Sequence, residues 1–353
     1  MVILEISLNI SHYSPYYTIN KRAILSNRHY ADWNSMGVKV GIIGCGRWGT
    51  IHLNTLNSLK KIGVVSEIHA CDLIASKEIE LSGLIDSFSA NWQTMVESME
   101  IDIIAIVTPG ETHCELALQV VDYCKALFIE KPIGLTQLEA SAIISRVQET
   151  GGNLLVGHIL RFHDLINEAN NLISKGTIGE LQRVDFSRIT TRAPPKNPNV
   201  FDALAIHGID TAYYCFGEME PVRASVDNLL INNNNEPIQA RISLEFPGAR
   251  EASINVGWNG DLEVREIVFS GSNGKIIVEM KDTDSINVLT SEYDQSIVLE
   301  NIQQPLKREW EYIIESLNGN NSSPIYPAPS SVLQCMKWLE VIKGKMDIIS
   351  IDY

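Results

Sequence analysis

The sequence predicts an α/β fold in two parts, a doubly wound parallel sheet followed by an α/β domain with a large open, mostly antiparallel sheet. Apolar strand-like runs alternate with helix-like segments from 38 to 157, which is the pattern of a parallel sheet. Between 222 and 290 strand-like runs follow one another with only turn residues between them, which is typical of hairpin-linked antiparallel strands. We expect an extension over 1–35, a first domain over 36–157 and a second over 158–353, whose last helices are candidates to pack back on the first.

Composition excludes several classes of function. The chain has 353 residues and a formal net charge of −15, a field that repels phosphate backbones, so we expect no nucleic-acid partner. A small local basic pocket for a sugar phosphate is still compatible with that charge. No apolar run is long enough to span a bilayer, so we expect no membrane partner. The six cysteines show neither Cys-x-x-Cys pairs nor zinc spacing, so we expect no metal, and reduced thiols in a cytoplasmic protein.

Residues 1–35 differ from the rest of the chain. Their short apolar start is interrupted by Glu5, and neither a basic n-region nor a small-residue cleavage site accompanies it, so a secretory signal is excluded. Two interpretations stay open: a poorly ordered extension, or translation from a start codon that the cell does not use. The clean strand pattern begins only after Met36.

A glycine motif follows the first strand. Val38–Ile43 is an apolar, β-rich run, and Ile51–Leu59 has helical character. Gly44, Gly46 and Gly49 between them form G-x-G-x-x-G in the strand–turn–helix context that a dinucleotide-binding site requires. The first glycine permits a tight turn, the second lets the backbone approach a pyrophosphate, and the third lets the helix pack on the strand. We expect the motif to bind the cofactor through Gly44, Cys45, Gly46, Arg47, Trp48 and Gly49.

The second strand ends in an acidic residue. "VSEIHACD" places Asp72 23 residues after Gly49, where a carboxylate accepts hydrogen bonds from a ribose 2′-hydroxyl and repels a 2′-phosphate. No arginine follows directly, although Lys77 is nearby. We therefore expect NAD as the cofactor, with NADP as the alternative.

Charged and polar residues recur where the later strands end. Strands are expected over 101–109, 126–129 and 153–157, with helices over 113–123 and 136–150 between them. Ligands of such sheets bind beyond the carboxyl ends of the strands. Thr108 and the pair Glu130 and Lys131 lie at those ends, as do Gly44 and Asp72. We interpret these side chains as facing a cofactor crevice.

Five short motifs together resemble the glucose–fructose oxidoreductase/inositol dehydrogenase (Gfo/Idh/MocA) family. "GIIGCGRWGTIHL", "IVTPGETH", "EKP", "VGHILRF" and "AIHGID" occur in the family's order and at its spacing. The resemblance implies an N-terminal Rossmann domain, a C-terminal α/β domain and NAD(P)-dependent oxidation or reduction of a sugar or related alcohol. On this basis we also expect cofactor contacts from Thr108, Pro109, His113, Glu130 and Lys131.

The same resemblance implies the catalytic residues. Lys131 matches the lysine that lies beside the nicotinamide and the reacting hydroxyl, Pro132 the proline that fixes its backbone, and His207 the active-site histidine of the second domain. Many members carry an aspartate four residues before that histidine, where this chain has Ala203. Asp202 is one residue further away, about 100° around a helix. Either the local backbone shifts to present Asp202, or the protein works without it.

Candidates for substrate binding lie in the second half. "VGHILRF" resembles members that oxidise UDP-N-acetylglucosamine at its 3-hydroxyl, but His163 and Asp164 replace their usual Asn-Pro, so this likeness is partial. Arg161 fits either a substrate contact or a surface arginine, and His158 either a contact or a structural histidine. A basic cluster near the following loop fits either a solvated edge, the simpler interpretation of each member alone, or a clamp for phosphate or carboxylate: Arg188, Arg192 and Lys196.

These residues predict alcohol chemistry on a sugar, nucleotide sugar or cyclitol. We expect Lys131 and His207 to share the hydroxyl proton, with His207 as the preferred base because its ordinary pKa is close to neutral. A non-catalytic, dinucleotide-binding sensor of the same fold is the alternative, and an imine- or bilin-type reductase fits these two side chains less well. One face of the second sheet is expected to meet a partner subunit, giving a homodimer or homotetramer.

Overall fold

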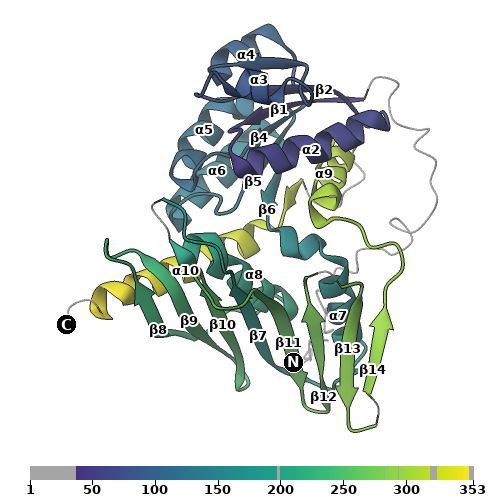
Figure 1. Cartoon of the computed structure of the whole chain (residues 1–353), viewed down its shortest axis with the longest axis vertical. Helices are drawn as coiled ribbons and strands as arrows, with labels where there is room; N and C mark the ends of the chain where they lie inside the picture. Colours follow the sequence, from purple (N-terminus) through teal and green to yellow (C-terminus); the bar gives the residue numbers. More distant parts are fainter. Residues whose placement is uncertain (1–36, 197–198, 282, 293, 319–323, 350–353) are drawn as a thin grey trace, which may run out of the picture. The chain divides into compact units, whose positions relative to one another are not determined.

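The computed structural model describes residues 37–196, 199–281, 283–292, 294–318 and 324–349 (Figure 1). The predicted extension over 1–35 lies outside the described residues. The chain forms a seven-stranded sheet in the order β15-β6-β5-β4-β1-β2-β3 and an eight-stranded sheet in the order β14-β13-β12-β11-β7-β10-β9-β8. The predicted fold class is thereby confirmed.

The seven-stranded sheet is parallel throughout. Its strands are β1 (Val38–Ile43), β2 (Val65–Cys71), β3 (Ser87–Ser89), β4 (Ile103–Ile106), β5 (Ala126–Glu130), β6 (Asn153–Gly157) and β15 (Ile325–Tyr326). Their apolar runs are continuous rather than alternating because helices cover both faces. The strand order reverses between β1 and β4, and a parallel sheet opens a ligand crevice at such a point.

Two pairs of helices cover the faces of this sheet (Figure 1). Helices α2 (Arg47–Lys61) and α9 (Pro305–Ser316) pack together on one face, and α5 (His113–Val120) and α6 (Gln137–Thr150) on the other. The shorter helices are α3 (Lys77–Leu81) and α4 (Trp92–Ser98). Helix α2 begins inside the glycine motif, four residues earlier than the predicted Ile51.

The end of the chain returns to the first sheet. Strand β15 pairs in parallel with β6, and α9 places Trp310 against Phe128 with ring centroids 5.0 Å apart. The sequence indicates the helix through its amphipathic pattern, but a two-residue strand carries no such signal. The first sheet is therefore completed by residues more than 170 positions after β6.

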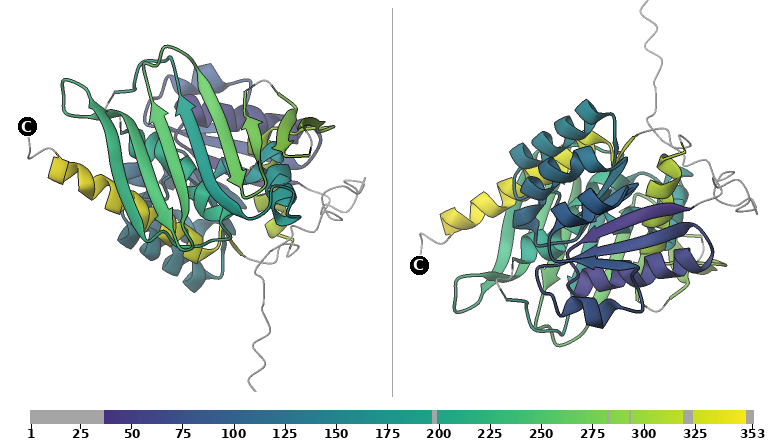
Figure 2. Two further views of the ribbon diagram at one scale, coloured as in Figure 1. Left: turned by 90° about the horizontal axis from the view of Figure 1, so that it is seen from below. Right: turned by 90° about the horizontal axis from the view of Figure 1, so that it is seen from above.

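The eight-stranded sheet is antiparallel except where β7 and β10 run parallel. Its strands are β7 (Leu181–Ile189), β8 (Arg223–Ile231), β9 (Pro237–Phe246), β10 (Arg250–Gly257), β11 (Val264–Gly271), β12 (Gly274–Glu279), β13 (Ser285–Thr290) and β14 (Asp294–Val298). One face packs against α7 (Asp164–Ser174), α8 (Ile206–Cys215) and α10 (Pro329–Ile349). The left view of Figure 2 shows the opposite face, which helices leave uncovered.

All six cysteines lie in the described part of the chain and are free thiols. Over that same part, every helix is too short or too polar to cross a membrane.

Candidate active site

The glycine loop after β1 has the geometry that a pyrophosphate needs. Gly44 adopts a φ of +97°, and a Cβ there would lie 2.8 Å from the backbone N of Thr108. A Cβ on Gly49 would lie 2.1 Å from the carbonyl oxygen of Gly44, so the helix packs on the turn as closely as glycine allows. A Cβ on Gly46 would meet no atom within 4 Å, which leaves the loop open on the side where a dinucleotide approaches. The loop therefore fits the cofactor.

Asp72 fastens this loop to the end of β2. Its Oδ2 accepts a 2.7 Å hydrogen bond from the Cys45 amide, and its Oδ1 accepts one of 2.9 Å from the Ile74 amide. The Cys45 thiol is fully buried, which raises its pKa to about 12, so this residue contributes its backbone to the loop. Arg47 is exposed beside it. The carboxylate thus stands at the edge of the crevice, between the loop and solvent.

Glu130, the last residue of β5, turns toward helix α2. Its Oε1 accepts hydrogen bonds of 2.6 Å from Trp48 Nε1 and 2.9 Å from His52 Nε2. The indole of Trp310 donates to His52 Nδ1 at 3.2 Å, which places the proton of the neutral ring on Nε2, facing Glu130. Burial acts to raise the pKa of Glu130, but the bonds from His52 and Trp48 lower it below its usual range. Glu130 and Trp48 therefore hold α2, with its glycine loop, against β5.

His113 joins the ends of β4 and β5. Its Nε2 lies 2.8 Å from the carbonyl oxygen of Thr108, and its Nδ1 lies 2.8 Å from that of Pro132. Pro109 precedes a short 3₁₀ turn, and the Lys131–Pro132 peptide bond is cis. The histidine is buried, so it fixes the loop that follows Glu130 rather than meeting a ligand directly.

Lys131 leaves this loop and reaches the second half of the chain. Its Nζ donates a 2.8 Å hydrogen bond to the carbonyl oxygen of Ala203. Burial lowers the pKa of Lys131 to about 8, with Glu130 opposing and Arg188 reinforcing that change. An amine with this pKa exchanges a proton near neutral pH far more readily than a solvated lysine does.

The segment that receives Lys131 is a π-helical turn, Phe201–Ala205, which leads into α8. A π turn adds one residue to the helical repeat, so positions five apart approach the same side. Asp202, five residues before His207, nevertheless points to α10, where Lys343 Nζ donates to its two oxygens at 3.0 and 3.3 Å. The local backbone does shift, and it offers the Ala203 carbonyl to Lys131.

His207 lies in the first turn of α8 and is 6 % exposed. Burial, followed by the nearby charges of Lys131 and Arg188, holds its pKa well below the usual 6.5. No group among the described residues forms a hydrogen bond with the ring, so it enters the site as a neutral imidazole whose nitrogens are available. Lys131 and His207, 76 positions apart in the chain, are thus brought together by one helix.

His158 and Arg161 belong instead to a buried ion pair. Arg161 donates to both oxygens of Asp210 at 2.8 to 3.0 Å, and its guanidinium lies 4.9 Å from the centre of the Tyr214 ring. His158 Nδ1 lies 3.4 Å from the same carboxylate. The ligand atoms of His158, Asp210 and Cys335 lie within 4.8 Å of one another, but Arg161 already neutralises the carboxylate that a cation would need.

The basic cluster divides between the surface and the site. Arg192 is exposed, and its Nε donates to the Thr190 hydroxyl at 3.2 Å. Arg188 is half-buried on β7 and acts electrostatically on both Lys131 and His207. His52 and Trp310 are the residues that the sequence analysis missed. The histidine of "GTIHL" was a signal that could have identified His52.

A glycine loop at the switch point of a parallel sheet, facing a lysine and a neutral histidine, defines a dinucleotide-dependent oxidoreductase. Residues 38–158 match the oxidoreductase family with an NAD-binding Rossmann fold (GFO/IDH/MocA), and residues 166–277 match the GFO/IDH/MocA C-terminal domain. The chain belongs to this family and is an NAD(P)-dependent dehydrogenase.

Similar proteins include cyclitol dehydrogenases. Inositol 2-dehydrogenase of Rhizobium meliloti is 25% identical over 273 residues, which is 73% of this chain and 80% of that protein. A scyllo-inositol 2-dehydrogenase (NAD(+)) of Bacillus subtilis is 26% identical over 72% of this chain and 77% of its own length. KijD10, a 3-ketoreductase from Actinomadura kijaniata crystallised with NADP and TDP-benzene, shares the fold with a TM-score of 0.77 at 14% identity, covering 87% of this chain and 97% of that one.

Proposed function

We propose that this chain transfers a hydride between a nicotinamide cofactor and a secondary hydroxyl or keto group of a sugar, nucleotide sugar or cyclitol. The observation that carries the proposal is the contact of Lys131 Nζ with Ala203, in the turn that leads to His207. It places both groups beyond the carboxyl ends of the strands, where the glycine loop opens. The relatives named for inositol oxidation and for a 3-keto substrate support the same class of substrate.

The proton is handled by the two side chains. When bound, the nicotinamide ring supplies the acceptor for the hydride. His207, neutral because it is buried among cations, accepts the proton of the substrate hydroxyl. Lys131 donates a charge-assisted hydrogen bond to the same oxygen and orients it, while Ala203 holds the ammonium in place. Asp202 takes no direct part, because Lys343 neutralises it.

The pH dependence tests this division of roles. We expect kcat/KM for oxidation to fall as the pH rises through about 8, because the Lys131 ammonium then loses its proton. His207 adds no limb above neutral pH because its pKa lies well below 6.5. The positive charge of a bound nicotinamide moves the falling limb further down. Initial rates across pH 6 to 10 (roughly the range in which the enzyme's lysine and histidine titrate) would measure the profile.

Lys131→Arg provides the control for that profile. An arginine stays charged over the whole range, so the falling limb is expected to disappear even if the rate itself is low. A rate that rises through pH 8 in the unmodified protein would contradict the assignment and make Lys131 the base.

Asp72 is proposed to favour NAD over NADP. Replacing it with asparagine keeps an oxygen for the Cys45 amide and removes the charge that repels a 2′-phosphate. We expect the ratio of kcat/KM for NADP to that for NAD to rise about tenfold or more, since two like charges a few ångströms apart near a surface repel by several kcal/mol. Glu78→Gln, an exposed carboxylate on α3, is the control and leaves the ratio unchanged. An unchanged ratio in Asp72→Asn would exclude this role.

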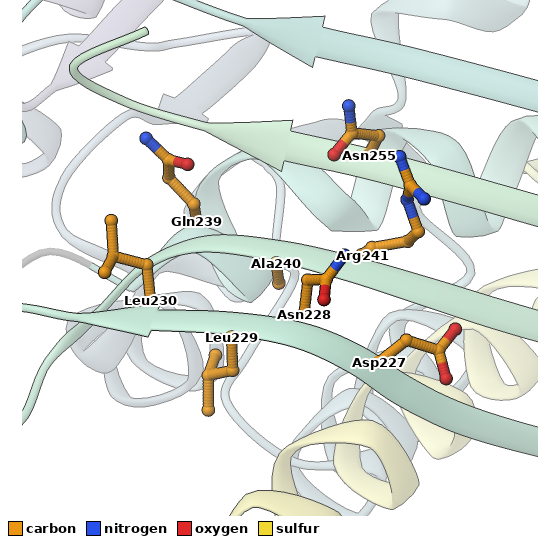
Figure 3. Close-up of a pocket in the computed structure, with 8 residues that line it drawn as sticks. All are labelled: Asp227, Asn228, Leu229, Leu230, Gln239, Ala240, Arg241 and Asn255. Atoms are coloured by element: carbon orange, nitrogen blue, oxygen red, sulfur yellow. The ribbon is translucent and has the colours of Figure 1, made fainter.

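We also propose that the protein is a cytoplasmic homo-oligomer that assembles through the uncovered face of the eight-stranded sheet. A hollow of about 430 Å³ over β8, β9 and β10 is lined by polar side chains, with Gln239, Arg241 and Asn255 pointing away from the core (Figure 3). These residues alternate with buried Ala240 and Val256, which face the helices. The sheet therefore separates this hollow from Lys131 and His207, and light scattering of the Arg241→Glu variant would test its role in assembly.

A further inference from the structure

Arg188 faces the catalytic side of the second sheet. Side chains alternate along β7, and Val184 and Phe186, four and two positions before Arg188, are fully buried on the helix-covered face. A Cβ on Gly208 would lie 2.8 Å from the ring of Phe186, so this face of β7 lies against the start of α8. Arg188 is the next inward-facing residue, on the same side as His207.

A second arginine stands directly opposite. Arg265 of β11 pairs with Arg188 across the antiparallel ladder, and its inward direction follows from Ile267 and Phe269, which are fully buried two and four positions later. Like charges directly opposite each other destabilise a sheet. A chain with 43 acidic and 28 basic residues has many carboxylates with which to avoid such a pair.

The one carboxylate close to this pair is already engaged with Arg265. Glu263 Oε1 accepts bonds of 2.8 and 3.0 Å from Arg265, and its Oε2 accepts one from the Thr191 amide at 3.3 Å. Arg188 forms neither a hydrogen bond nor an ion pair with any described residue. Burial and then the charges of Arg265 and Arg192 lower the pKa of Arg188 to about 10, so it stays charged at neutral pH.

An unpaired, half-buried guanidinium beside two further cations is a cost that the folded protein carries without a ligand. An anion between Arg188 and Arg265 removes that cost. The planar guanidinium matches the geometry of carboxylate and phosphate groups, and both bind it through two parallel hydrogen bonds. The cluster lies on the far side of His207 from the glycine loop, where the non-reacting part of a substrate extends.

We propose that Arg188 and Arg265 bind an anionic group of the substrate, a carboxylate or a phosphate, while Lys131 and His207 hold its reacting hydroxyl. The inference rests on the proposed function for the second half of that sentence and narrows its substrate class. Sugar acids, sugar phosphates and nucleotide sugars are then preferred to uncharged cyclitols.

Initial rates with four probes test the preference: D-glucuronate, D-glucose 6-phosphate, UDP-N-acetylglucosamine and uncharged myo-inositol, each with saturating NAD. The anionic probe that turns over best tells whether carboxylate or phosphate is preferred. In Arg188→Gln, kcat/KM for that probe is expected to fall about 10- to 150-fold, mainly through KM, which is the loss of a hydrogen bond to a charged group. Arg183→Gln is the matched control, because this arginine lies on the same strand but pairs with Asp185 and Glu251 on the opposite face.

A binding measurement separates this inference from the proposed function. In the NADH-saturated protein, the preferred anion is expected to raise Tm, and Arg188→Gln is expected to abolish that rise. Without a ligand, Arg188→Gln is expected to raise Tm, since it removes a charge that faces Arg265, and a raised Tm also shows that the variant folds.

The outcomes are distinguishable. Myo-inositol turning over as well as the anions, with Arg188→Gln unaffected, overturns the anion site and leaves the proposed function standing. Anion binding that depends on Arg188 without any reduction of NAD supports the site and contradicts the proposed chemistry. Arg188→Lys keeps the charge without the fork, and an intermediate KM for it supports bidentate recognition.

Discussion

Replacing Lys131 with alanine is expected to lower kcat/KM by about 10²- to 10⁴-fold, the range that a positioned proton donor or acceptor contributes. The ammonium lies within 2.8 Å of the Ala203 carbonyl, in the turn that leads to His207, and burial brings its pKa to about 8. Both the orientation and the charge at the reacting oxygen are lost with it. The rate of NADH formation with the preferred substrate would measure the effect, and NADH fluorescence titration would separate lost chemistry from lost cofactor binding.

His207→Asn completes the test as half of a double-mutant cycle. If Lys131 and His207 act on one proton, the double variant loses little more than the worse single variant, because residues that act as a unit are not additive. Lys60→Ala is a suitable control, since this lysine pairs with Asp86 far from the crevice. A Lys131→Ala protein that keeps most of its turnover would contradict the proposed mechanism.

The parts of the site that the sequence predicts are those set by local geometry. The glycine loop is fixed by contacts among residues a few positions apart, and Gly44 and Gly49 show the close approaches that exclude any other side chain. The strand ends are equally local, since an apolar run followed by Thr108 or by Glu130 marks where each strand stops. Parallel pairing then brings those ends to one edge without further information.

The partners of the predicted residues could not be predicted, because they come from remote segments. His52 reaches Glu130 across 78 positions, and Trp310 reaches His52 across 258. A spacing rule also misplaces Asp202, because the π turn that leads to His207 is recognised only by its hydrogen bonds. Which face of a strand is buried decides whether an arginine is structural or functional, and that depends on tertiary packing.

Arg161 illustrates the same limit and leads to the prediction with the largest effect on stability. The sequence places it at a strand–helix junction where substrate contact is plausible, yet Asp210 engages it through three hydrogen bonds. Both side chains are 3 % or less exposed. The pair joins the segment after β6 to α8, so it fixes the helix that carries His207 relative to the first sheet.

Asp210→Asn is expected to destabilise the fold by about 3–5 kcal/mol, because Arg161 then stays buried without a counter-charge. The double variant Arg161→Met, Asp210→Leu is expected to recover most of that loss, since apolar side chains of similar volume remove both desolvation penalties. Urea denaturation followed by circular dichroism would give the midpoints of the three proteins. Arg146→Met, at an exposed pair with Asp122, is the control and is expected to cost less than about 1 kcal/mol. A double variant as unstable as Asp210→Asn would show that the charges themselves, rather than the filled volume, hold α8 in place.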